Sequence, residues 1–581
     1  MAKQTIPPQI RIRAMVIEDY EQVRHLWMTI HGFGIRSIDD TREEVDRFLK
    51  RNPTTSVVAV CGEKVVGAIL CGSDGRQGCL YHVCVAKKYR RQGIGRRMVG
   101  YCMNALRRDR INRVTLIAFT KNDVGNAFWR QIGWTCRQDC NYYQFELNKE
   151  NITRFVEYQE EQKRKRHKMG NCKVTRIEGG VTAAKGFQAA AAAAQIKYKG
   201  RTDMAMIYSA SPCTAAGTFT RNVVKAAPVI WDRDLVQSRK PMHAVIVNSG
   251  IANACTGQEG LDYCRQTAEA AALNLNISPD SVLVGSTGVI GFQLPIDRIK
   301  AGVAALAKDL GEDAEHGTAA AKAIMTTDTH KKECACTFEI DGRTVTVGGM
   351  AKGSGMIHPN MCTMLGYVTT DAAVEASVLQ TAVSAIVDET FNMISVDGDT
   401  STNDTLLVLA NGEAGNEMIT AAKGPAYEAL YEALYTICRE LAMQMAGDGE
   451  GATKLIEVNV EGMDTIANAR VLAKSVICSS LTKAAVYGSD ANWGRILCAL
   501  GYAGVEFDPN DLQLYFVDGD SKMLIFTEGA AADYSEEEAT ELLKKEKVTI
   551  LAQFHMGQAS ATAWGCDLTY DYVKINADYR S

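Results

Sequence analysis

Hydrophobic positions in the first quarter of the chain follow two spacings. Short runs rich in β-branched residues predict strands, and segments with apolar residues three and four apart predict helices. We expect strands at Gln9–Val16, Thr55–Cys61, Val65–Ser73, Cys79–Val85 and Arg113–Phe119. We expect helices at Asp19–His31 and Thr41–Asn52, in a segment ending near Asp109, and at Asn122–Ile132, followed by a β pair through Leu147. This alternation predicts a mixed α/β fold for residues 9–147.

The pattern changes twice further along the chain. Between Asn148 and Gly170 a dense charge run, Glu157 to Lys168, is typical of a solvated helical linker. A nucleic-acid-binding arm is the alternative, but no binding motif accompanies the charges. After Cys172 the chain is rich in Ala, Gly and Val, and it has no heptads and no 20–50-residue repeat.

The remainder of the chain again alternates between strands and helices. Predicted strands include Ala244–Asn248 and Ser281–Val284, and predicted helices include Asp262–Leu273 and Ile296–Leu310. One large mixed α/β unit fits this pattern better than several small domains.

Charge divides the chain at the same place. Its 581 residues are 46% hydrophobic and 23% charged, which excludes disordered, collagen-like and disulfide-scaffold proteins. The net charge of -4 hides an asymmetry. Residues 1–170 hold 31 Lys and Arg against 18 Asp and Glu, a net of +13, and the remainder holds 33 against 50, a net of -17. The asymmetry indicates two units of separate origin.

The cysteines and the chain's start indicate a compartment. Eighteen cysteines are scattered without a CxxC pair or zinc-type spacing, which is typical of a reducing cytosol. The first residues lack the apolar core of a signal peptide, and no apolar stretch reaches 18 residues. We therefore expect a soluble, cytoplasmic protein without a membrane-spanning helix, a bound metal or a nucleic-acid partner.

One segment of the front part carries the features of a phosphate-binding loop. Arg90 to Gly95 follows a predicted strand and opens a predicted helix. Glycines allow backbone N–H groups to approach a pyrophosphate, and the dipole of the helix favours an anion at its N-terminus. Basic residues surround the segment: Lys87, Lys88, Arg90, Arg91, Arg96 and Arg97.

With this segment, residues 9–147 resemble the GNAT-type N-acetyltransferases. The match rests on Arg90-x-x-Gly93-x-Gly95 and on a later group, Asn122, Ala127, Phe128 and Gly133-Trp134. The resemblance implies a mixed sheet with helices and acetyl-CoA as a co-substrate, with no tightly bound cofactor. The residues that it implies for acetyl-CoA binding are Val83, Val85, Arg90, Arg91, Gly93, Gly95, Arg96 and Asn122.

Trp129 departs from the family pattern, because many members have there a Tyr that serves as general acid. An indole is a poor proton donor to a thiolate, yet some relatives lack the Tyr, so activity is not excluded. A domain that only senses acetyl-CoA, or that acetylates an unrelated amine, is the alternative. His82 is a candidate base acting through water, or else a packed histidine of a surface strand.

The back part contains a threonine that chain cleavage would activate. The glycine-rich segment from Lys352 runs to Cys362-Thr363. If the bond before Thr363 is cut, the new α-amino group, with an unperturbed pKa of about 7.7–8.0, becomes a general base beside the hydroxyl. A structural glycine loop is the alternative interpretation.

From about Cys172 to Ser581 the chain resembles the ornithine acetyltransferase family of arginine biosynthesis. Ordered matches span this whole part: residues 178–183, 247–250, 285–291, 325–329, 352–365, 397–404, 448–454, 492–495 and 576–581. The resemblance implies a large α/β sandwich that cleaves itself between Cys362 and Thr363. The implied parts are a GNAT-type domain at 1–148, a linker at 149–170, an α segment at 171–362 and a β segment at 363–581.

The resemblance also implies the chemistry. Thr363 would take the acetyl group from N2-acetylornithine and pass it to glutamate, with ping-pong kinetics. The Thr287 hydroxyl and the Gly288 N–H would form the oxyanion hole. Some members also make N-acetylglutamate from acetyl-CoA, and the usual assembly has two α and two β chains. A hydrolase is the alternative, because an acetyl-enzyme can lose its acetyl group to water.

Substrate-binding residues follow from the same resemblance. Lys352 can pair with an α-carboxylate and Glu450 with a substrate ammonium, and Thr327 is an equally good interpretation of the Thr326 position. The implied set is Thr326, Lys352, Thr363, Glu450, Asn576 and Ser581. Cys362 stands where many members have Ala, and its small side chain should still permit cleavage.

Overall fold

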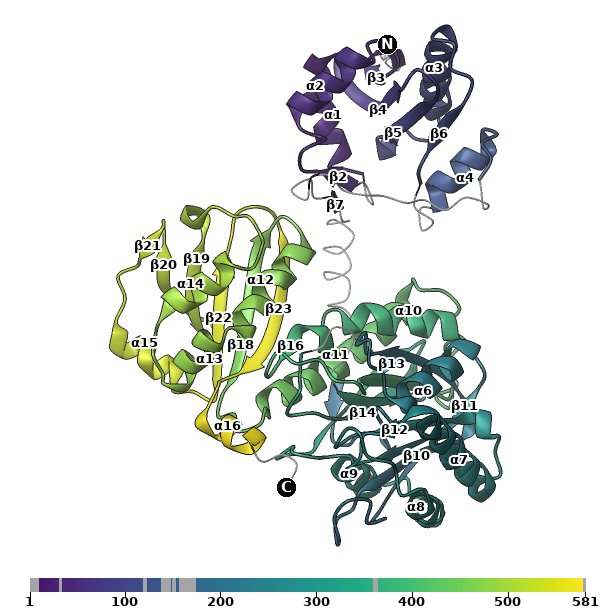
Figure 1. The fold of residues 1–581 in the computed structure, drawn as a ribbon, viewed down its shortest axis with the longest axis vertical. Helices are drawn as coiled ribbons and strands as arrows, with labels where there is room; N and C mark the ends of the chain where they lie inside the picture. Colours follow the sequence, from purple (N-terminus) through teal and green to yellow (C-terminus); the bar gives the residue numbers. More distant parts are fainter. Residues whose placement is uncertain are drawn as a thin grey trace. The chain divides into compact units, whose positions relative to one another are not determined.

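The computed structural model describes residues 10–30, 34–118, 123–136, 148, 153–155, 174–358 and 364–577. The chain divides into two compact units, Met1–Gln162 and Lys163–Ser581 (Figure 1). None of the described helices combines the length and apolar character needed to traverse a lipid bilayer.

The front unit is built on a five-stranded sheet, as far as its described residues show. The strand order is β1-β3-β4-β5-β6, antiparallel except for the parallel pair β5 and β6. The strands are β1 (Ile10–Ala14), β3 (Val57–Cys61), β4 (Lys64–Ser73), β5 (Gly78–Val85) and β6 (Val114–Leu116). They coincide with the predicted strands to within a few residues, because their apolar runs fill both faces of the sheet.

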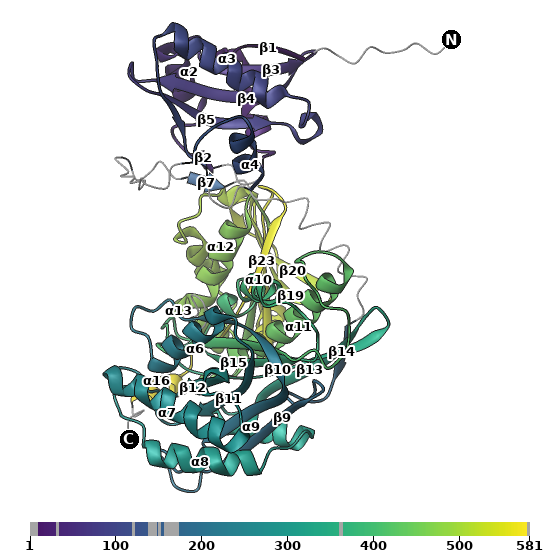
Figure 2. The same cartoon turned by 90° about the vertical axis from the view of Figure 1, so that its right-hand side faces the viewer.

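Helices cover both faces of this sheet (Figure 2). They are α1 (Tyr20–Trp27), α2 (Arg42–Arg51), α3 (Ile94–Arg108) and α4 (Asp123–Gln131). One buried apolar cluster joins α1 and α2 to the sheet around Trp27, and a second joins α3 around Met98. A small separate sheet pairs β2 (Gly34–Arg36) with β7 (Thr153–Phe155), so three residues of the predicted linker form a strand. The rest of that linker, and the predicted β pair through Leu147, lie outside the described residues except for Asn148.

In the described part of the back unit, the larger sheet has nine strands. Their order is β12-β11-β10-β17-β15-β14-β13-β8, and β9 also pairs with β10. The strands are β8 (Thr175–Ile177), β9 (Phe187–Ala192), β10 (Met204–Phe219), β11 (Met242–Asn248), β12 (Val282–Ser286), β13 (Lys332–Ile340), β14 (Arg343–Lys352), β15 (Leu365–Thr370) and β17 (Thr405–Ala410). Every residue of β15 and β17 is buried, as expected for a parallel pair covered on both faces.

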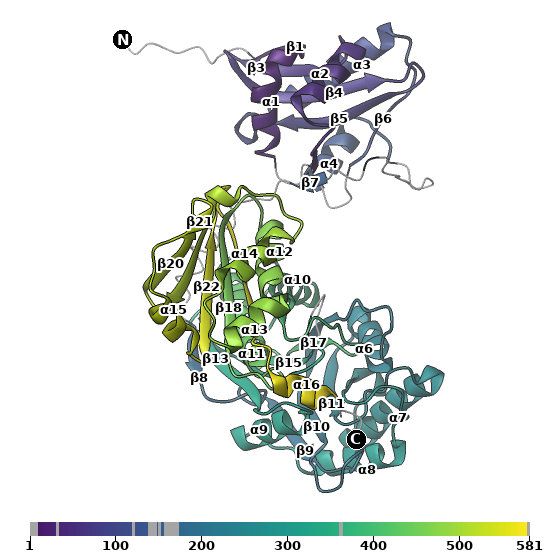
Figure 3. The same ribbon diagram turned by 60° about the vertical axis from the view of Figure 1, so that its left-hand side comes forward.

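A second sheet of seven strands completes the described back unit (Figure 3). Its order is β16-β23-β18-β22-β19-β20-β21. The strands are β16 (Ile394–Ser395), β18 (Leu455–Met463), β19 (Gln513–Asp518), β20 (Ser521–Thr527), β21 (Ala530–Ala531), β22 (Lys547–Gln553) and β23 (Ala559–Cys566).

Helix α11 (Pro425–Gly447) packs against strands of both sheets, including β13 and β23. It starts with Pro at a position where no backbone N–H is needed, and its buried apolar residues recur every three or four positions, so one long helix can serve two cores. The remaining helices are α6 (Ala227–Ser238), α7 (Gly257–Leu275), α8 (Ile296–Lys308), α9 (Ala314–Ala323), α10 (Ala376–Val387), α12 (Ile466–Cys478), α13 (Ser480–Tyr487), α14 (Trp493–Gly501), α15 (Glu536–Leu543) and α16 (Tyr570–Ala577). Five short 3-10 turns complete the described elements: Ile17–Asp19, Lys87–Tyr89, Pro279–Ser281, Phe391–Met393 and Pro509–Asp511. The predicted mixed α/β class is confirmed for both units.

Candidate functional site

Strand register fixes the surroundings of Lys352 at the end of β14. Lys352, the last residue of β14, is the cross-strand partner of Leu365, and Leu365 in turn pairs with Thr405. Thr363 and Cys362 lie outside the described residues, but the description resumes at Met364, whose carbonyl accepts a hydrogen bond from Thr405 N at 2.8 Å. Lys352 therefore lies beside the segment that follows the predicted nucleophile.

The predicted oxyanion-hole residues form a turn after β12. Thr287 N donates to Asn248 O at 3.0 Å, and the Lys352 Nζ donates to Thr287 Oγ1 at 3.4 Å. Gly288 has φ +133°, and a Cβ there would lie 2.2 Å from the carbonyl carbon of Gly250, so only glycine fits. Among the described residues the Gly288 N–H makes no hydrogen bond. A backbone donor held without an internal partner is what an oxyanion requires.

A buried ionic chain holds Lys352. Its Nζ lies 3.8 Å from Asp328 Oδ2, and Asp328 Oδ1 accepts from Lys332 Nζ at 2.7 Å and from Gly353 N at 2.7 Å. The Asp328 and Lys332 side chains are 0% and 1% exposed. Burial opposes the charge of Asp328, but the cations of Lys352 and Lys332 outweigh it and hold the pKa of this carboxyl well below its usual range.

Burial also acts on Lys352, lowering the pKa of its ammonium, and the nearby Asp328 carboxylate opposes that shift. The Lys352 side chain is 10% exposed. A cation with so little contact with water can bind a small carboxylate strongly, because little water screens the pair.

Glu450 and Asn576 meet at a second side of this region. Asn576 Nδ2, on α16, donates to Glu450 Oε2 at 2.7 Å, and Glu450 N donates to Ser354 O at 2.8 Å. A Cβ on Gly355 would lie 2.4 Å from the Glu450 carboxyl carbon, which explains the glycine at that position. Glu450 is buried. Ser581 lies outside the described residues.

The structure separates the two threonines that the sequence left open. Thr327 Oγ1 is hydrogen-bonded to Ser354 Oγ at 2.8 Å, whereas the Thr326 backbone N donates to Asp328 Oδ2 at 3.0 Å. Arg201 reaches the Thr326 carbonyl at 3.2 Å. Among the described residues the Thr326 hydroxyl makes no hydrogen bond, so its side chain is the better placed of the two to meet a ligand.

In the front unit, the predicted phosphate-binding loop has the backbone that such a loop needs. Arg91 and Gly93 have φ of +61° and +74°, and Gly93 directly precedes α3. A Cβ on Gly95 would lie 3.2 Å from the Phe128 ring, so the helix packs closely on α4 there. The side chains of Arg90 and Arg91 are exposed near the N-terminus of this 15-residue helix. Positive charge and the helix dipole therefore coincide.

Strand β5, which precedes this loop, is paired with β6 along only part of its length. β5 pairs with β6 only from Gly78 to Leu80, so Val83 and Val85 lie beyond the last described pairing on that edge. Both valines pack in the cluster that includes Phe128 and Trp129. The Trp129 ring lies 5.0 Å from Phe128 and 5.1 Å from Trp134, so it forms part of an apolar wall. Asn122 lies outside the described residues.

Comparison with known proteins identifies the back unit. The ArgJ family model matches residues 188–581. The arginine biosynthesis bifunctional protein ArgJ of Symbiobacterium thermophilum is 53% identical over 407 residues, covering 70% of this chain and 99% of that protein. The chain belongs to the ArgJ family. ArgJ 1 of Clostridium acetobutylicum is 48% identical over 395 residues, covering 68% of this chain and 96% of that protein.

Solved structures of ArgJ proteins are also similar to this chain. Bacillus halodurans ArgJ is 49% identical with a TM-score of 0.36, and covers 37% of this chain and 99% of its own. Mycobacterium tuberculosis ornithine acetyltransferase, solved with ornithine, is 42% identical with a TM-score of 0.31, and covers 32% and 99%. The GNAT acetyltransferase family model matches residues 20–134. Both resemblances read from the sequence are thus confirmed, and the protein is an acyltransferase.

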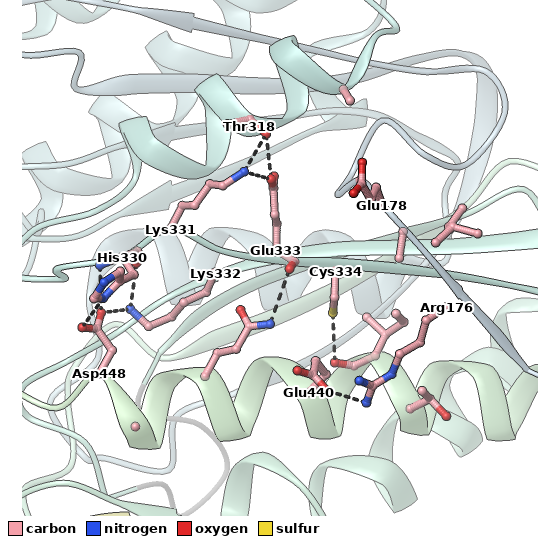
Figure 4. A pocket seen from close by; sticks show the side chains of 18 residues that line it. Arg176, Glu178, Thr318, His330, Lys331, Lys332, Glu333, Cys334, Glu440 and Asp448 are labelled. Carbon is pink, nitrogen blue, oxygen red and sulfur yellow. Dashed lines mark hydrogen bonds and ion pairs between the residues drawn. The ribbon is translucent and has the colours of Figure 1, made fainter. Parts of the chain in front are cut away.

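A cavity of about 840 Å³ lies next to the ionic chain of Lys352, Asp328 and Lys332 (Figure 4). Lys332 and Asp448 line it and are joined at 2.5 Å, and Figure 4 shows Lys331 and Glu333 meeting near Thr318. None of the predicted site residues that the structure describes lines this cavity. Within the described chain, no three His, Cys, Asp or Glu side chains gather as a metal site would require.

Sequence reasoning missed the groups that position the predicted ones. Asp328 lies in a matched segment, but its pairing with Lys352 and Lys332 has no local signature. Arg201 and Ser354, which contact Thr326 and Thr327, were not predicted as site residues either. A carboxylate in a Thr-rich turn, followed four residues later by a lysine at the start of a buried strand, was the one available signal.

Proposed function

We propose that the back unit transfers an acetyl group from N2-acetylornithine to glutamate, releasing ornithine and N-acetylglutamate. Thr363, freed by self-cleavage after Cys362, attacks the acetyl carbonyl and holds the acetyl group as an ester. Glutamate then replaces ornithine and takes the acetyl group. The observation that carries the proposal is the convergence of Lys352, Thr287 and Gly288 beside Leu365, the first residue of β15.

The charges in this region match the substrates. N2-acetylornithine presents a carboxylate and a distant ammonium, and Lys352 and Glu450 carry the opposite charges. Glutamate shares the carboxylate that Lys352 would bind. Ser581 and the Asn576 amide would complete the site near the substrate ammonium, and Thr326 would add a hydroxyl.

We further propose that the front unit uses acetyl-CoA to acetylate an amine, glutamate being the first acceptor to test. Arg90, Arg91 and Arg96 would hold the pyrophosphate together with the backbone at Gly93 and Gly95. Asn122, Val83 and Val85 would line the pantetheine and acetyl group. Newly made N-acetylglutamate would then replenish the acetyl groups that the back unit recycles. We place the enzyme in the cytoplasm, as two α and two β chains.

A Thr363→Ala variant tests the back-unit mechanism. Purified protein should run on a denaturing gel as fragments of 362 and 219 residues, and the variant as one chain of 581. Transfer from N2-acetylornithine should fall by at least about 10⁴-fold, because the attacking group is gone. Mass spectrometry of the wild type with N2-acetylornithine alone should find an acetyl group on the fragment that starts at Thr363.

The matched control is Thr381→Ala, which replaces an exposed threonine on α10. This variant should cleave itself and turn over N2-acetylornithine normally. Turnover of N2-acetylornithine by uncleaved protein would defeat the mechanism. Ornithine release that needs no glutamate would indicate a hydrolase.

A further inference from the structure

A histidine in the front unit occupies an unusual backbone position. His82 has φ +48°, a left-handed conformation that a non-glycine residue seldom adopts. The register between β4 and β5 shifts between the pairs Ala68–Cys84 and Leu70–Tyr81, so His82 lies in a β-bulge. Bulges re-aim side chains, and strained residues concentrate at functional sites. The bulge also lies just past Leu80, where the pairing of β5 with β6 ends.

Two buried partners fix the imidazole. His82 Nε2 lies 2.7 Å from Asp40 Oδ1, and the ring lies 4.6 Å from the Trp27 indole at 49°. The Asp40 side chain is 6% exposed and that of His82 is 17% exposed. The imidazole is therefore held firmly while part of it still meets solvent.

Two hydrogen bonds in turn hold Asp40, one at its carboxylate and one at its backbone carbonyl. Its Oδ2 accepts from Arg36 N at 2.7 Å, and its carbonyl accepts from the Tyr20 hydroxyl at 2.8 Å. Tyr20 comes from α1, Arg36 from β2 and Asp40 from the turn before α2, so the ionisable groups around this pair come from three elements. The carboxylate that orients the imidazole is therefore itself positioned by a backbone N–H, and the Asp40 backbone by a tyrosine hydroxyl.

The bulge also lies between two functional surfaces. Val83 and Val85 pack with the α3 and α4 side of the sheet, next to the acetyl-CoA loop. His82 contacts Trp27 and Asp40, which belong to the α1 and α2 side. A group at this point of β5 can meet an acceptor that enters from one side and an acetyl thioester held on the other.

We propose that His82, oriented by Asp40, is the proton acceptor of the front unit and deprotonates the ammonium of the acceptor substrate. This inference rests on the proposed acetyl-CoA-dependent activity of the unit. A carboxylate paired with an imidazole fixes the ring and stabilises the imidazolium formed by proton transfer.

The step balances without a further reagent. The ammonium gives one proton to His82, and the free amine nitrogen attacks the thioester carbonyl carbon. The C–S bond breaks, and the second proton of the attacking nitrogen goes to the departing thiolate, giving the thiol of coenzyme A. His82 releases its proton to solvent. No tyrosine acid is needed, which agrees with the packed Trp129 at that position.

The test uses the full chain carrying Thr363→Ala, so that acetyl-CoA consumption reports on the front unit. Acetyl-CoA is offered with glutamate, ornithine, lysine or a short peptide with a free N-terminus, and the released thiol is measured. In this background His82→Gly should lower kcat by about 10²–10⁴-fold. The glycine suits the φ of +48° and leaves a space for added imidazole, which should restore part of the rate. The affinity for acetyl-CoA should not change.

Two matched controls are available. His25→Gln removes an exposed histidine from α1, and Asp46→Asn breaks a surface pair with Lys50, and both should leave kcat unchanged. Asp40→Asn should lower kcat with the acetyl-CoA affinity intact. For all amines, the loss in His82→Gly should shrink at a pH where the acceptor is already unprotonated. A kcat unchanged in His82→Gly, or a loss that imidazole does not restore, overturns the inference. A parent that acetylates none of the amines overturns the proposed activity of the front unit itself.

Discussion

The two units expose their functional charges in opposite ways. In the back unit, Lys352, the cation proposed to bind the substrate, is buried. Lys352 and Lys332 share the carboxylate of Asp328, whose side chain has no exposed surface. In the front unit Arg90 and Arg91 extend into solvent beside a helix N-terminus. Removing one partner of a buried ion pair strongly destabilises the fold, because the other charge is left buried and unpaired. Exposed arginines attract a polyanion from solution, and each can be replaced separately. The contrast predicts which unit responds to mutation and which to ionic strength.

The largest effect is expected from removing the buried counter-ion. Asp328→Asn leaves Lys332 and Lys352 without their shared charge, which should cost about 3–5 kcal/mol of unfolding free energy. Denaturant unfolding measures it. Asp280→Asn is the control, because its pair with Lys240 is exposed and should cost less than about 1 kcal/mol. Equal losses for the two variants would contradict the contrast between buried and exposed charges.

A Thr287→Val variant should affect chemistry rather than folding. It removes one proposed oxyanion donor at nearly constant volume, and kcat for acetyl transfer from N2-acetylornithine should fall by about 10²–10³-fold. Acetyl-CoA turnover by the front unit should stay as it was. Two glycine variants separate steric clash from backbone strain. Gly288 and Gly291 both have positive φ, so alanine is strained at either position, but only at Gly288 does a Cβ also lack space. A normal kcat in Thr287→Val would remove that hydroxyl from the mechanism.

Salt should act mainly on the front unit. Raising ionic strength from 0.05 to 0.5 M should increase KM for acetyl-CoA by about tenfold, because the arginines are exposed and screened. KM for N2-acetylornithine should change by less than about twofold, since Lys352 is enclosed. Steady-state kinetics at several salt concentrations give both values. A stronger salt response in the back unit would reverse the comparison.

The smallest expected effect is a shift with pH. Burial lowers the pKa of Lys352, so its positive charge is lost at a lower pH than for an ordinary lysine. KM for N2-acetylornithine should therefore rise by a few-fold as the ammonium deprotonates, starting at a lower pH than an unperturbed lysine would give. Lys352→Arg should move that rise to higher pH, because a guanidinium keeps its charge. Identical profiles for the two proteins would assign the rise to the substrate's own ammonium.

Helices and strands were predicted well where the local pattern of hydrophobic and turn residues determines the structure. The β3–β4 hairpin, helix α3 after its glycine loop and the buried strand β11 were found because hydrophobic spacing and turn residues agree there. The 16-residue strand β10 was not singled out, since its small and polar residues break the pattern. β7 was assigned to a linker because pairing with β2, more than 110 positions away, leaves no local trace.

Site residues divide in the same way. Thr287, Lys352 and Glu450 were predicted through matched segments, and the structure brings the first two within 3.4 Å. Asp328, Lys332 and Asp40 were not found, because each acts through a partner that only the folded chain supplies. A carboxylate is ordinary in a sequence, and only burial beside a cation or an imidazole makes it functional.

The order of strands in the large sheet has a consequence for the proposed cleavage. β15 and β17 come after position 363, yet they lie between β10 on one side and β14 on the other, which both come before it. Scission would therefore cut the chain without freeing either piece, because the β15–β17 pair of one fragment is hydrogen-bonded on both sides to strands of the other. The two fragments would therefore remain together as one folded unit. Assembling the enzyme from separately made fragments should require that they are refolded together.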